Sequence, residues 1–397
     1  MQSPNSNPTF DPPKNLNWTI EEIKRALPRS VFEHRPLVSL TTLARDVAIA
    51  VLFLWSMVTI KTFLAARGLS MIIPVIWPVY WWLQGLVFTG LWVIGHECAH
   101  ESFLSSKIGC TLIGLVSNIQ IQFPLPLIQV QVCHTFLFTP HFSWKATHRI
   151  HHRYHGHMVL DQHWIPPLKS EVNVKRDTFW DYLEDTPLVV LAKLLVQQMI
   201  GFQSYLLLNI SGPRHYPLST SHFNPYSIMF KSQDRSAVII SDIAILVMVW
   251  IVKQAVHMWG ARDVFMFYGI PCLIVSHWVT MVVFLHHTDP MVPHYRERSW
   301  NYTRGALATV DRDFLGWQGR FFLHDIAHFH VIHHLFPRIP FYNVETATQH
   351  LKALIGKDYH STTEPVFKSL WNNYRSCQFV EDEGDVVFYK SFMQKSA

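Results

Sequence analysis

Residues 68–95 read GLSMIIPVIWPVYWWLQGLVFTGLWVIG, and no charged side chain occurs between Arg67 and His96. Because a helix rises 1.5 Å per residue, about 20 residues cross a hydrocarbon core about 30 Å thick. The stretches 47–66, 236–252 and 264–285 have a similar composition. Charged residues make up only 15% of the chain, against about 25% in soluble domains. We therefore expect an all-α integral membrane protein with four transmembrane helices.

The rest of the chain predicts the topology. It divides into a cytoplasmic N-terminal arm (1–45), the membrane domain (46–340) and a polar, cytoplasmic C-terminal tail (341–397). Basic residues concentrate in the arm and in the middle loop, 141–186. The positive-inside rule then places both termini and this loop in the cytoplasm. The stretches 108–140 and 194–212 are apolar but contain polar residues, which favours interfacial or re-entrant helices. The net charge of +5 does not indicate nucleic-acid binding.

Three histidine clusters carry the chemistry. They follow the second span, occupy the middle loop and follow the fourth span, so all three lie on the cytoplasmic side. An H-x-x-H-H pattern should arise by chance roughly 0.1 times in a chain of this composition, yet two occur. Residues i, i+3 and i+4 share a helical face, so we expect each cluster to direct its imidazoles one way. The clustered histidines are His96, His100, His148, His151, His152, His330, His333 and His334.

This number of imidazoles favours a pair of metal ions. One tetrahedral zinc ion needs four ligands at most, whereas neutral imidazole also suits iron. Two irons held by neutral ligands keep a high positive charge, which favours attack on an unactivated C–H bond with O₂. A multi-pass zinc hydrolase or receptor is a distant alternative, and a scaffold with pH-sensing histidines is another.

The clusters and the residues around them resemble the membrane-bound fatty acid desaturases, particularly the Δ12 (oleate) branch and its fungal members. The resemblance rests on GHECAHESF (95–103), HRIHHRYHGHM (148–158), FLHHTDP (284–290) and HHLFPRIPFYN (333–343), and covers about residues 15–360. It implies a di-iron (Fe²⁺) enzyme that uses O₂ to desaturate the acyl chain of a lipid. It also implies that the eight clustered histidines bind iron, with His287 as a ninth ligand. We expect no catalytic residue beyond these ligands.

The resemblance further implies an enzyme of the endoplasmic reticulum membrane that receives electrons from cytochrome b5 and its NADH-dependent reductase. No heme-binding His-Pro-Gly-Gly motif occurs in the chain, so we expect a separate donor protein. Glu101, His286 and His328 depart from the family pattern near the metals. An acetylenase, conjugase or hydroxylase, acting on an acyl chain or a lipid-derived secondary metabolite, is therefore an alternative. His155 is a weaker candidate ligand. We expect His157 to have a structural role or to support a ligand, and His328 to support a ligand.

Overall fold

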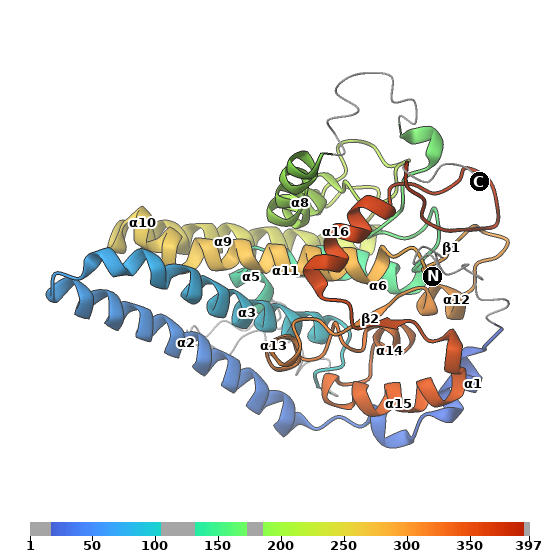
Figure 1. Ribbon diagram of the computed structural model, residues 1–397, viewed down its shortest axis with the longest axis horizontal. Coiled ribbons are helices and arrows are strands. Elements are labelled where there is room, and N and C mark those ends of the chain that lie inside the picture. The colour runs from blue at the N-terminus through green and yellow to red at the C-terminus, as the bar shows by residue number, and fades with distance from the viewer. Residues whose placement is uncertain (1–16, 105–131, 173–185, 393–397) are drawn as a thin grey trace, which may run out of the picture.

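The computed structural model describes residues 17–104, 132–172 and 186–392. Its long helices are α2 (Pro36–Ala66), α3 (Ile73–Ala99), α8 (Pro187–Leu208), α9 (Arg235–Trp259) and α11 (Ile270–His287). In Figure 1, α2, α3, α9 and α11 run lengthwise beside one another. Helix α3 packs against α2 and α11, which explains why it is the most buried of these helices from residue 84 onward.

The outer helices expose apolar side chains that water would not favour. Helix α2 leaves Val51 and Trp55 60% and 63% exposed, and α9 leaves Leu246 and Trp250 67% and 60% exposed. Contiguous apolar surface of this kind marks a lipid-facing wall. The all-α integral membrane fold expected from the sequence is therefore confirmed.

Five helical segments of the described chain are long and apolar enough to cross a membrane. Four of them overlap the expected spans, and the fifth is α8. In Figure 1, α8 is seen nearly end-on, across the direction of the other four. It overlaps the stretch 194–212, for which the sequence indicated an interfacial or re-entrant helix. Most of the other such stretch, 108–140, lies outside the described residues.

Short helices form a cap at the end of the bundle where α3 and α11 stop. Ile23, Leu307, Ile332 and Leu351 meet there in one apolar core. A capping box formed by Thr19 begins the first of these helices. The cap contains α1 (Ile20–Ala26), α6 (His141–Tyr154), α12 (Tyr302–Leu307), α14 (His330–Leu335) and α15 (Val344–Ile355). Along the bundle, α5 (Val132–Phe136) packs against α3 and α9, α13 (Trp317–Phe322) against α3, and α16 (Val366–Ser376) against α11.

Residues 342–392 pack against the rest of the protein and do not form a loose tail. Strand β4 (Val386–Val387) pairs antiparallel with β1 (His294–Tyr295). Strand β3 (Ser361–Thr362) pairs parallel with β2 (Asp311–Arg312). Helix α10 (Ala261–Val264) and a π-helical turn, Phe265–Gly269, lead into α11 at the other end of the bundle.

Candidate metal centre

Two groups of histidines lie together where α3 and α11 end. In each group the possible ligand atoms all lie within 4.8 Å of one another, and every member except the partly exposed His100 is buried. We call them the first and second histidine groups. The first contains His96, His100, His148, His152 and His333, and the second contains His151, His155, His287 and His334.

Helical spacing explains how the histidines divide. Residues four apart project from one face of a helix. His148 and His152 of α6 therefore share the first group, whereas His151 and His155 share the second. Adjacent residues point about 100° apart around a helix, so His333 belongs to the first group and His334 to the second. The expectation that each cluster directs all its imidazoles one way is therefore wrong, because the second and third clusters each supply both groups.

The spacing between nitrogen atoms fits ligands that share one metal ion. The Nε2 atom of His148 lies 2.9 Å from that of His100 and 3.1 Å from that of His152. The Nε2 atoms of His152 and His333 lie 3.2 Å apart. A metal–nitrogen distance of 2.0–2.1 Å separates neighbouring ligands of one ion by about 2.8 Å in octahedral geometry to about 3.4 Å in tetrahedral geometry. The first histidine group therefore has the spacing that a metal ion requires.

His330 borders the second histidine group. Its Nδ1 atom lies 3.0 Å from the carbonyl oxygen of Ile326, to which it can donate a hydrogen bond. That bond leaves the Nε2 lone pair facing Nε2 of His334 at 3.1 Å and Nε2 of His287 at 3.4 Å. The structure thus brings all nine histidines expected from the sequence into one site.

Asp161 joins two members of the second histidine group and was not expected from the sequence. Its Oδ1 atom accepts a hydrogen bond from Nδ1 of His151 at 2.8 Å and one from the backbone N–H of His163 at 2.9 Å. Its Oδ2 atom lies 3.4 Å from Nδ1 of His155. Such carboxylate partners fix the orientation of a metal-binding imidazole. In the sequence, Asp161 stands out only as an acidic residue ten positions after His151.

The position of His155 differs from that of the other members. Its Nε2 atom lies 2.8 Å from the carbonyl oxygen of Ala308. Only Nδ1 then keeps a lone pair, and that atom faces Asp161. His155 is therefore a member of the second histidine group, but its hydrogen bond with Ala308 favours a supporting position over direct ligation.

Burial keeps these imidazoles neutral. It lowers the pKa of His148, His152 and His333 well below the ordinary value, and neighbouring histidines lower it further. Burial alone would raise the pKa of the Asp161 carboxyl, but its contacts with His151 and His155 lower this pKa below the ordinary range. Neutral imidazole carries the lone pair that binds a metal, and an ionised carboxylate supports it.

Two other histidines near the clusters have separate roles. The Nδ1 atom of His157 accepts hydrogen bonds from the backbone N–H groups of Val159 and Leu160, which gives this residue the structural role expected. His328 was expected to support a ligand, and this expectation is wrong. Its Nε2 atom lies 3.3 Å from a carboxylate oxygen of Asp313, whose side chain is 55% exposed.

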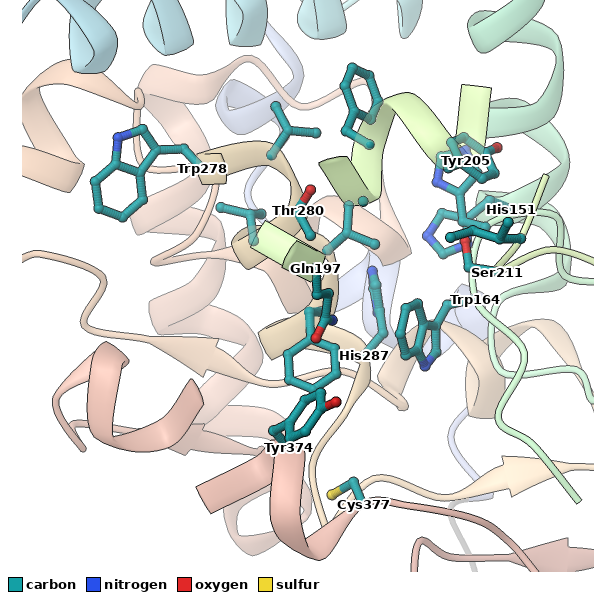
Figure 2. A pocket seen from close by; sticks show the side chains of 18 of the residues that line it. His151, Trp164, Gln197, Tyr205, Ser211, Trp278, Thr280, His287, Tyr374 and Cys377 are labelled. Carbon is teal, nitrogen blue, oxygen red and sulfur yellow. The ribbon is translucent and has the colours of Figure 1, made fainter. Parts of the chain in front are cut away.

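A cavity of about 570 Å³ reaches the histidines between α8 and α11. Aromatic side chains form much of its wall, among them Trp164 and Trp278. Figure 2 shows His287 near the centre of the lining residues and His151 toward the right of the view. The cavity is therefore a largely apolar space that ends on both histidine groups. Its walls combine segments far apart in sequence, which sequence patterns do not reveal.

Comparison with known proteins agrees with this geometry. The family model for fatty acid desaturases matches residues 75–365, which include all three histidine clusters. A Δ12 fatty acid desaturase of Mortierella isabellina is 37% identical, over 94% of this chain and 90% of the relative. An oleoyl-12-hydroxylase of Ricinus communis is 35% identical, over 92% and 88%. A fatty acid conjugase of Calendula officinalis is 33% identical, over 95% and 92%.

Proposed function

This chain belongs to the fatty acid desaturase family, and from that premise we propose that it introduces the Δ12 double bond into an oleoyl chain with O₂ at a di-iron centre. One observation carries the proposal: two groups of buried histidines lie at the wall of an apolar cavity. The Δ12 position is supported by the Mortierella relative, whose identity exceeds that of the hydroxylase and the conjugase.

The ligand assignment follows from the nitrogen positions. We propose that the first histidine group holds one iron, and that His151, His287, His330 and His334 hold the other. Bound iron would activate O₂ so that it can attack an unactivated C–H bond. The protein's own contribution is to fix the ligands, hold the chain beside them and exclude water. Asp161 fixes His151, and the aromatic walls give the acyl chain an apolar surface.

We further propose that α8 lies along the membrane surface and does not cross it. The three clusters meet in one site, so the chain crosses the membrane an even number of times between the second and the third. Helices α9 and α11 account for two crossings and leave none for α8. With α8 on the surface, both termini and the three clusters lie on one side of the membrane. We propose that this is the cytoplasmic side of the endoplasmic reticulum, where cytochrome b5 and its reductase would supply electrons. A glycan attached to Asn17 in cells would contradict it.

Expression in a host that makes oleate but no polyunsaturated fatty acids tests the reaction. Mass spectrometry of total acyl chains should show linoleate. His151→Ala and His333→Ala should abolish the product, whereas His215→Ala, which alters an exposed histidine outside both groups, should retain it. Metal analysis of the purified protein should give two irons per chain. A hydroxylated or conjugated product would contradict Δ12 desaturation, and a single zinc ion without iron would contradict the di-iron centre.

A further inference from the structure

The segment Val366–Phe392, here called the C-terminal segment, is fastened directly to the metal centre. It follows the region that the family model matches. The side-chain amide of Asn373 donates a 2.6 Å hydrogen bond to the carbonyl of Thr288, the residue after His287. The indole N–H of Trp164 donates to the hydroxyl of Tyr389 at 2.7 Å. The C-terminal segment is thus tied to the ends of two histidine-bearing parts of the chain.

A set of hydrogen bonds to backbone carbonyls also holds this segment in place. The guanidinium group of Arg296 donates to the carbonyls of Glu381, Asp382 and Gly384 at 2.7–3.0 Å. Strand β4 pairs with β1 on the same side. Together, these contacts give the segment one defined position, which a specificity-determining wall requires.

The side chains of the C-terminal segment form one wall of the cavity. In Figure 2, Tyr374 and Cys377 lie on one side of His287, and Trp278 lies toward another edge of the view. The cavity therefore extends from the histidines in more than one direction, and the C-terminal segment bounds one of these. Its lining residues are Tyr374, Arg375, Cys377, Gln378, Tyr389 and Phe392.

We propose that the C-terminal segment is part of the acyl-binding site, and that Tyr374 and Cys377 set how long a chain the cavity accepts on their side of the metal centre. This inference rests on the proposed function, because it requires that the cavity hold an acyl chain. Apolar pockets distinguish chains that differ by one methylene by about 10–200-fold. A change in the volume of this wall should therefore change the preferred chain length and not only the rate.

Two substitutions with opposite effects on volume test the proposal. Tyr374→Ala removes a ring from the wall and should raise the ratio of longer to shorter substrates converted by about tenfold. Cys377→Phe adds a ring and should lower that ratio by a similar factor. Trp371→Ala is the matched control, because this aromatic residue lies on the same helix but does not line the cavity. Yeast cells expressing each variant would be fed monounsaturated acids of graded length, and the acyl products quantified.

The outcomes separate this inference from the proposed function. Opposite shifts with Tyr374→Ala and Cys377→Phe, and none with Trp371→Ala, would support it. Iron content per chain shows whether each variant is folded, and Tyr374→Leu replaces Tyr374→Ala if that variant fails to load iron. An unchanged chain-length profile in iron-loaded variants would overturn the inference while leaving the desaturase function intact. A wild-type enzyme that makes no acyl product would overturn both.

Discussion

Replacement of Asp161 by asparagine should weaken iron binding in the second histidine group. The carboxylate accepts hydrogen bonds from His151 Nδ1 and from the backbone N–H groups of His163 and Gly156. An amide offers one acceptor oxygen in place of two, so at least one of these donors loses its partner. Loss of such a partner to a ligand typically lowers metal affinity about 10–100-fold, which corresponds to about 1.4–2.7 kcal/mol.

The structure places this substitution toward the upper end of that range. Asp161 is 1% exposed, so no water replaces the lost acceptor, and an unpaired buried donor costs about 1–3 kcal/mol. The assay is iron content per chain during dialysis of the detergent-solubilised protein against a chelator. Asp161→Asn should lose about one iron while wild type keeps two. Asp313→Asn, which alters the exposed partner of His328, is the control. Equal iron retention by Asp161→Asn and wild type would refute the reasoning.

Three further predictions concern the residues around the site. His330→Ala should lower iron content, because the hydrogen bond of Nδ1 leaves Nε2 of His330 available to bind a metal. His155→Ala should lower it less, because Nε2 of His155 is hydrogen-bonded to a backbone carbonyl; equal losses in metal analysis would make His155 a ligand. Asp46→Asn should destabilise the protein by about 1–3 kcal/mol, because the buried Asp46 carboxylate lies 2.8 Å from Nε2 of His324 and a buried polar group that loses its partner costs this much; thermal unfolding in detergent measures this, and an unchanged Tm would contradict it. Gly90→Ala should cost about 1–3 kcal/mol in the same assay, because its Cβ would lie 2.3 Å from a backbone oxygen; wild-type stability would show that the backbone yields there.

The sequence identified the histidines of the site better than it predicted their arrangement. Histidine clusters are rare, and the spacing of their residues can be read directly from the sequence. The division of α6 between the two groups depends on how that helix is rotated against α14. His155 was only a weak candidate because periodicity places it correctly but does not reveal its hydrogen bond with Ala308. Asp161 carried no pattern of its own, since a single acidic residue in a loop is usually solvated.

Length, hydropathy and histidine spacing by themselves determined an all-α membrane protein with its three histidine clusters on one side. These features are local, because an apolar stretch must form a helix to satisfy its backbone in lipid. Only the tertiary structure decided which imidazoles share a group, how α8 runs relative to the other helices, and which residues enclose the cavity. The C-terminal segment shows the physical reason. Its sequence is polar enough to indicate a tail, yet hydrogen bonds and strand pairing with distant residues make it a wall of the cavity.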